Sequence, residues 1–102
     1  MIRFEILLPL FYNDGWPVED EKYLATDDER VAAFGATSTD TVIVRGHWLY
    51  QSTICDDRLI RVRLDLADIP ENWQKMRDIK EVLKKRFDQI DIWISAHRIE
   101  IL

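Results

Sequence analysis

Hydrophobic and polar residues alternate most regularly along residues 58–66. The apolar positions are Ile60, Val62, Leu64 and Leu66, and the positions between them are Leu59, Arg61, Arg63 and Asp65. Because successive side chains of a strand point to opposite faces, this pattern predicts a strand with one apolar face and one largely charged face. The apolar face requires a core beneath it, and the charged face is a candidate surface for a ligand or a partner.

Three further segments alternate in the same way, at residues 2–9, 41–51 and 92–97. Pro9 should weaken pairing at the end of the first segment, because proline has no amide hydrogen to donate. Gly46 predicts a bulge or a close approach of another backbone in the second. Residues 52–57 are expected to turn the chain into the next strand as an antiparallel hairpin. A change of phase near Arg98 predicts a bulge in the last segment.

A short helix is expected after the first strand. Thr26 and Glu29 have the spacing of a capping box, which predicts Thr26 as the N-cap of a helix over residues 27–34. Gly35 suits the left-handed position at which many helices end. The preceding residues, Asn13 to Ala25, stay open between a helical turn and a structured loop.

The second helix is the stronger prediction. Asp68 with Glu71 three residues later marks its start, and its spacing continues to about Gln89. Its buried stripe is expected to comprise Trp73, Met76, Ile79, Lys80, Leu83, Phe87 and Ile90.

The predicted order is strand, helix, strand, strand, helix, strand, which is the split βαβ pattern of ferredoxin-like domains. We therefore expect one α+β domain over residues 1–102. Its antiparallel-rich sheet should have four strands in the order 4-1-3-2, with both helices on one face. The strand at residues 58–66 is then central.

Composition narrows the function classes. The 102 residues are 47% hydrophobic and 32% charged, which is typical of one ordered domain with one core. The formal net charge of -5 disfavours indiscriminate binding to nucleic acid or to an anionic membrane. The single cysteine, Cys55, excludes an internal disulfide and fits a reducing compartment. With no leader-like N-terminal segment either, we expect a soluble cytoplasmic protein without a membrane partner.

The central third of the chain carries a recognisable arrangement. Phe34-Gly35-Ala36-Thr37-Ser38 is followed by Arg45-Gly46-His47-Trp48 and then by Asp56-Asp57 before a strand. This arrangement resembles small uncharacterised bacterial proteins that carry a Phe-Gly-(Gly/Ala)-Thr segment before a Gly-x-Trp hairpin. The resemblance implies a ferredoxin-like fold and brings no assigned activity.

The open face of the expected sheet holds the candidate binding residues. Arginine forks on such a face hold carboxylates or phosphates in a way that lysine does not. Three interpretations stay open: solvated cross-strand ion pairs, a homodimer or protein interface, and a site for a small anionic ligand or RNA. The candidates are Arg3, Glu5, Arg45, His47, Arg61, Arg63, Asp65, Trp93 and His97.

Several chemistries are disfavoured. RNA binding through a sheet needs aromatic residues on the central strands, where Arg61 and Arg63 stand instead. His47 and His97 belong to opposite edge strands, so no metal site is expected. Cys55 precedes two aspartates, which raise rather than lower a thiol pKa, so we expect no nucleophile there. No phosphate loop or other cofactor motif is present, and we expect no cofactor.

One further segment, the loop that holds Tyr12, Trp16 and Tyr23, is a candidate lid, although packing of these aromatic rings over one end of the core is the preferred interpretation. For the chain as a whole we expect a non-enzymatic binding or interaction module that acts through the open sheet face as a homodimer. The alternative is a small enzyme or sensor that binds an anionic metabolite through Arg61 and Arg63, with His47 or His97 moving a proton.

Overall fold

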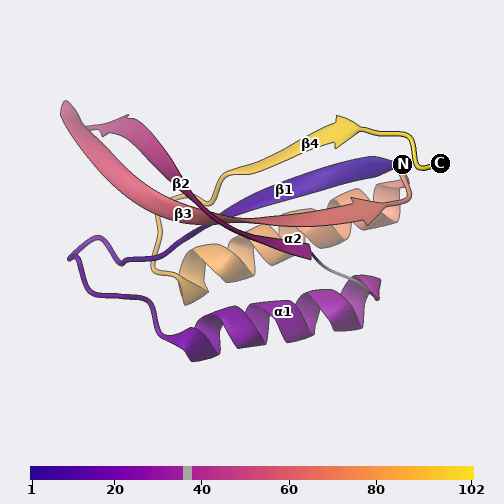
Figure 1. Cartoon of the computed structure of the whole chain (residues 1–102), viewed down its shortest axis with the longest axis horizontal. Coiled ribbons are helices and arrows are strands. Elements are labelled where there is room, and N and C mark those ends of the chain that lie inside the picture. Colours follow the sequence, from indigo (N-terminus) through magenta and orange to yellow (C-terminus); the bar gives the residue numbers. More distant parts are fainter. Residues whose placement is uncertain (36–37) are drawn as a thin grey trace.

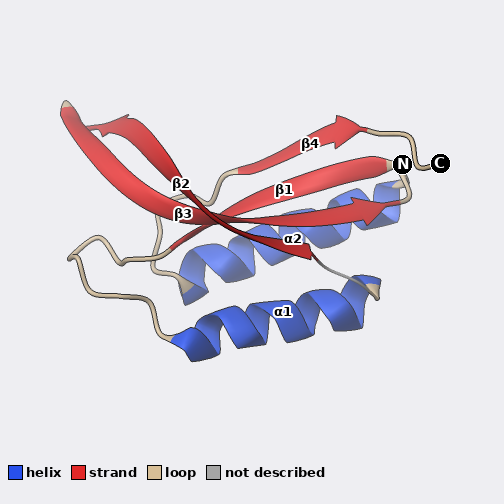
Figure 2. Cartoon of the chain, viewed as in Figure 1, coloured by secondary structure: helices blue, strands red, loops and turns tan. Residues whose placement is uncertain are grey.

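The structure is a computed structural model that describes residues 1–35 and 38–102, without the side chains of residues 38–42, 48, 50 and 54–56. Its elements follow the chain as β1 (Ile2–Pro9), α1 (Asp20–Phe34), β2 (Ser38–Tyr50), β3 (Thr53–Leu66), α2 (Pro70–Arg86) and β4 (Ile94–Arg98) (Figure 1). The predicted α+β class, with four antiparallel strands and two helices, is confirmed (Figure 2).

The sheet has β3 and β1 at its centre. Its order is β2-β3-β1-β4, and every neighbouring pair is antiparallel. Counted from the β4 edge, the same neighbours read 4-1-3-2. Both helices lie together on one side of the sheet, which leaves the other side open (Figure 1).

The core fills the space between the helices and one face of the central strands. Alternate residues of β1 are buried there, as the sequence pattern predicts. The rings of Phe4 and Trp73 meet edge to face with centroids 5.0 Å apart, which joins β1 to α2. The buried apolar residues are Ile2, Phe4, Ile6, Leu8, Val18, Val62, Leu64, Leu66, Met76, Leu83, Phe87 and Ile92.

Helix α1 begins earlier than predicted, at Asp20 instead of Asp27. The predicted N-cap, Thr26, lies in the middle of the helix, where its hydroxyl donates to the carbonyl of Lys22 at 2.7 Å. The segment Asn13 to Ala25, expected as either a helical turn or a loop, is therefore a loop up to Glu19 and a helix from Asp20. Gly35 takes the predicted left-handed position with φ 84, and its N–H donates to the Val31 carbonyl.

The β2–β3 hairpin turns at a different place from the predicted one. Gln51 and Ser52 have positive φ angles of 48 and 65, and β3 starts directly afterwards at Thr53. Residues 53–57, expected in the turn, are therefore strand. This part of the hairpin, residues 43–59, is called the arm; none of its described side chains is buried, and its turn end extends past the helices (Figure 1). Polar residues cost little in a strand whose side chains are not buried.

Helix α2 starts after an N-cap at Ile69 and ends at Arg86, before the predicted end at Gln89. Asp68 is not the cap, because its carboxylate accepts from the indole N–H of Trp73 at 2.8 Å. Ile90, predicted in the buried stripe, lies beyond the helix and is exposed. In β4 the pairing is regular up to Arg98, so the predicted bulge is wrong.

Candidate functional site

An ion pair joins the two central strands on the open face, near the start of β1 and the end of β3. Arg3 on β1 lies opposite Asp65 on β3, and Glu5 lies opposite Arg63. The Arg3 guanidinium donates from Nε to Oδ1 of Asp65 at 2.7 Å and from Nη2 to Oδ2 at 3.0 Å. These bonds hold the pKa of Asp65 below its usual value and raise the pKa of Arg3. Arg61 is the next residue of β3 on this face, and it lies opposite Leu7 of β1.

The placement predicted for β2 is wrong. Ile43, Arg45 and His47 were expected beside the arginines of β3, but Ile43 lies opposite Ile60, and Arg45 lies opposite Arg58. Directly opposite residues share a face, and Ile60 packs against the core. The open face of β2 is instead formed by the alternate positions, with Val44 opposite Leu59. The reason is that no described side chain of the arm is buried, so its apolar residues do not show which face of the strand meets the core.

A cavity of about 490 Å³ lies where the open face meets this arm. Its walls come from the end of β1, from both strands of the arm and from the segment between α2 and β4. The backbone N–H of Leu7 donates to the carbonyl of Trp93 at 3.0 Å, which fixes that segment against β1. The lining residues are Leu7, Pro9, Gly46, His47, Asp57, Leu59, Gln89, Ile90, Asp91, Ile92 and Trp93.

The cavity combines apolar walls with a few polar groups. Trp93 is 67% exposed, so most of its indole is accessible to a ligand. The polar groups are the carboxylates of Asp57 and Asp91, the imidazole of His47 and the amide of Gln89. Asp91 also forms an ion pair with Lys80, in which the Asp91 Oδ1 and the Lys80 Nζ are 3.1 Å apart. A cavity with this lining suits a partly apolar ligand that carries hydrogen-bond donors or positive charge.

Of the predicted site residues, the structure brings only His47 and Trp93 to the cavity. Sequence reasoning missed its other lining residues. One signal was present, because Leu7 and Leu59 are apolar on a face whose other positions are mostly charged. The residues from Gln89 to Ile92 gave no such signal, since their place in the cavity follows from the early end of α2.

The two histidines lie on opposite edge strands, as predicted. His97 on β4 stands opposite Arg3, whereas His47 lies on β2 at the other edge of the sheet. Within the described residues, no group of three histidine, cysteine or acidic side chains is placed to hold a metal ion. The side chain of Cys55, predicted to be inert, lies outside the described residues.

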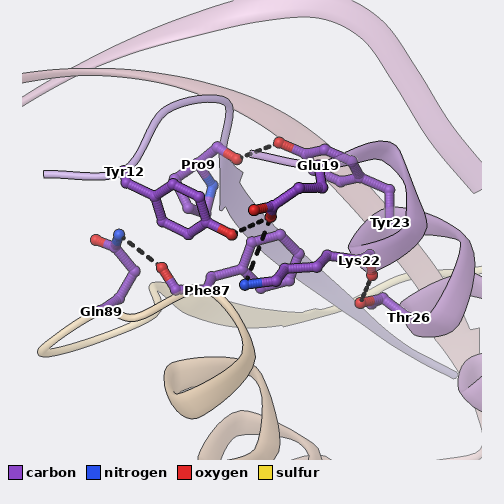
Figure 3. A network of polar contacts seen from close by, with 8 residues as sticks. All are labelled: Pro9, Tyr12, Glu19, Lys22, Tyr23, Thr26, Phe87 and Gln89. Atoms are coloured by element: carbon purple, nitrogen blue, oxygen red, sulfur yellow. Dashed lines mark hydrogen bonds and ion pairs between the residues drawn. The ribbon is translucent and has the colours of Figure 1, made fainter. Parts of the chain in front are cut away.

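A second polar cluster joins the long loop to α1 (Figure 3). The Tyr12 hydroxyl donates to the Glu19 carboxylate, and the ammonium of Lys22 lies 4.7 Å from the Tyr12 ring centroid. The Tyr23 hydroxyl donates to the Pro9 carbonyl, and burial raises the pKa of Tyr23 to about 12. Tyr12 and Tyr23 therefore pack against the core as preferred, whereas Trp16 is 71% exposed and does not.

Comparison with known proteins shows a likeness in fold to a solved structure. No protein-family model and no curated protein matches the chain. Among solved structures, the chain is similar to a phage SAM lyase in complex with S-methyl-5'-thioadenosine, with a TM-score of 0.72. The two chains are 15% identical over 95% of this chain and 80% of the lyase. At this identity the likeness concerns the fold alone. Among the described residues, no helix is both long and apolar enough to cross a membrane.

Proposed function

We propose that this ferredoxin-like chain is a binding module that acts through the open face of its sheet and holds a small molecule in the cavity beside Trp93. The observation that carries the proposal is the cavity itself. Its volume of about 490 Å³ falls within the range of about 300–1,000 Å³ typical of small-molecule sites. The ion pair of Arg3 with Asp65 lies at the opposite end of the two central strands, and the two side chains are bonded to each other there, which leaves the cavity end as the better site.

The lining indicates the chemistry of the ligand. Leu7 and Leu59 form apolar walls, and the Trp93 indole offers a flat surface for stacking with a planar ring. Asp57 and Asp91 supply carboxylates, which accept hydrogen bonds from hydroxyl or amino groups and attract positive charge. A planar ring joined to a polar or cationic group is the ligand that these residues fit.

The structural likeness favours a second candidate function, an enzyme that acts on SAM or a related compound. The similar phage protein is a SAM lyase that was solved with S-methyl-5'-thioadenosine. A nucleoside thioether has a planar base and ribose hydroxyls, and SAM adds a positively charged sulfonium. Both match the combination of Trp93 with two carboxylates.

Binding is tested by titrating the purified chain with S-methyl-5'-thioadenosine, SAM and adenosine while tryptophan fluorescence and thermal stability are followed. A ligand in the cavity should change the fluorescence of wild type and raise its melting temperature. Trp93→Ala should abolish both effects. Trp16→Ala is the matched control, because this equally exposed indole does not line the cavity. No response to any of the three compounds, or equal loss in both variants, contradicts this ligand class.

Turnover separates a binding module from an enzyme. Incubation with SAM, followed by chromatography for S-methyl-5'-thioadenosine, should show no product if the chain only binds. Asp57→Asn should weaken binding of a cationic ligand. The anionic-metabolite alternative makes the opposite prediction: AMP should bind, and Arg61→Gln should weaken that binding more than Asp57→Asn does.

A further inference from the structure

The two edges of the sheet are protected very differently. At one edge, β4 has only five residues, and short edge strands offer little for another chain to pair with. At the other edge, β2 has 13 residues, of which only Asp40 and Arg45 are charged, and it contains neither lysine nor proline. Lysine, proline and shortness are the usual means by which proteins block strand addition. The β2 edge has none of them.

The arm at the end of this edge is also exposed on its faces. Ile43 is 54% exposed and Leu49 is 69% exposed. They are six residues apart on β2 and therefore lie on the same face of the strand. The turn end of the arm, beyond Leu49, extends past the helices (Figure 1). An apolar strand edge with exposed apolar residues is a surface that a protein partner normally buries.

We infer that the β2 edge is the interface at which two copies of this chain pair, antiparallel and around a two-fold axis at Gly46. In a two-fold pair of identical strands, each residue faces the one equally far on the other side of the axis. An axis at Gly46 sets Ile43 opposite Leu49 of the second copy, and Leu49 opposite its Ile43. The exposed apolar residues of the arm are then buried against each other twice.

Other registers fit less well. An axis at Arg45 sets two arginines directly opposite each other, and like charges at that position destabilise a strand pair. An axis at His47 sets Arg45 opposite Leu49 of the second copy and sets Ile43 opposite the polar Gln51. The register irregularity of β2, between Thr39 and Ile43, lies outside the paired segment when the axis is at Gly46.

This interface goes beyond the proposed ligand site and does not depend on a ligand. It does adjoin that site, because Gly46 and His47 line the cavity. A second copy paired at Gly46 would therefore lie at the cavity's β2 side. All tests below use the ligand-free chain, so that failure of the interface and failure of the ligand proposal remain distinct.

The register is tested by disulfide trapping in a Cys55→Ser background. A chain with both Ile43→Cys and Leu49→Cys should form a covalent dimer on mild oxidation, because opposite residues have Cα atoms within disulfide range. Each single variant alone should stay monomeric on a non-reducing gel, because six residues of strand separate the two equivalent positions by about 20 Å. An equimolar mixture of the two single variants should cross-link. Cross-linking of either single variant alone overturns the register.

The interface itself is tested by sedimentation. The wild-type chain should sediment as a dimer at high micromolar concentration, and the double variant Ile43→Lys/Leu49→Lys should sediment as a monomer. Leu24→Lys, on exposed α1, is the matched control and should remain dimeric. Circular dichroism checks that the double variant is folded; if it is not, the trapping experiment decides. A monomeric wild type, or open-ended aggregates in place of a dimer, overturns the proposal.

Discussion

Arg3 and Asp65 join the two central strands through a two-point ion pair on the open face, with Nε–Oδ1 and Nη2–Oδ2 distances of 2.7 and 3.0 Å. The hydrogen bonds from Arg3 are the main cause of the lowered pKa of Asp65. Folding is therefore favoured while this carboxyl is ionised. Its contribution is complete above the ordinary aspartate pKa of about 3.9 and is lost as the pH falls through the lower pKa of the folded state.

We expect Arg3→Met to lower the melting temperature by no more than about 5 °C near pH 7, because exposed ion pairs contribute little. The difference from wild type should begin to shrink as the pH falls below about 4, and it should vanish below the lowered folded pKa, where Asp65 is protonated in both states. Melting curves across this range measure the effect. Arg77→Met, on an exposed part of α2, is the control and should show no such pH dependence. A difference that stays constant down to low pH would contradict this role for the pair.

Replacing either of two helix arginines, Arg30 or Arg86, by methionine should change the free energy of unfolding, but in opposite directions. Arg30 on α1 is 1% exposed; its Nη2 donates to the Asp27 carboxylate, but its Nε and Nη1 have no hydrogen-bond partner among the described residues. Burial lowers its pKa to about 10, so the charged form is disfavoured in the fold. Arg86 on α2, in contrast, donates to the Thr26 hydroxyl at 2.9 Å and to both carboxylate oxygens of Glu29.

Arg30→Met should raise the free energy of unfolding by about 1–3 kcal/mol, because it removes buried donors that lack acceptors. Arg86→Met should lower it by about 1–2 kcal/mol, since it breaks a hydrogen-bonded bridge between the helices. Urea denaturation at neutral pH compares the two. Equal destabilisation by both substitutions would show that Arg30 has acceptors that the described residues do not supply.

The sequence pattern was most informative where one face of an element is buried. Alternation predicted β1 at its observed bounds because its inner residues pack beneath the helices. It failed on the arm, where no described side chain is buried. It also failed at the start of α1, because the buried positions of that helix are Thr26 and Arg30 and so carry no apolar period. The capping-box spacing at Thr26 therefore placed the helix start at Asp27 instead of Asp20, where the helix begins.

The candidate site was less predictable than the fold. Its cavity depends on the twist of the arm and on the segment after α2, and both follow from tertiary contacts. Trp93 and His47 were predicted as binding residues for a charged surface, yet the structure groups them with Leu7, Leu59 and two aspartates. Residue types alone therefore indicated two of the lining residues, whereas the apolar character of the site required the strand register.

Tyr23 should carry a pH-dependent part of the stability at the alkaline end. Its hydroxyl donates to the Pro9 carbonyl, and burial is the main cause of its raised pKa of about 12. A raised folded pKa means that the contribution is complete below the ordinary tyrosine pKa of about 10 and is lost as the pH rises toward the folded value. Tyr23→Phe should cost about 1 kcal/mol at neutral pH and remove the most alkaline phenolate transition. An ultraviolet titration that keeps this transition would assign it to another tyrosine.

Adjacent residues of α2 test how the helix is oriented on the sheet. Leu83 is fully buried among core residues, whereas its neighbour Val82 is 43% exposed. Leu83→Ala removes apolar contacts and leaves a space that the surrounding rings fill only partly, so we expect a loss of about 2–5 kcal/mol in unfolding free energy. Val82→Ala should change it by less than about 0.5 kcal/mol, as is usual for surface positions. Urea unfolding of the two variants under identical conditions measures the difference. Similar losses at both positions would mean that α2 is rotated about its axis relative to the arrangement described above.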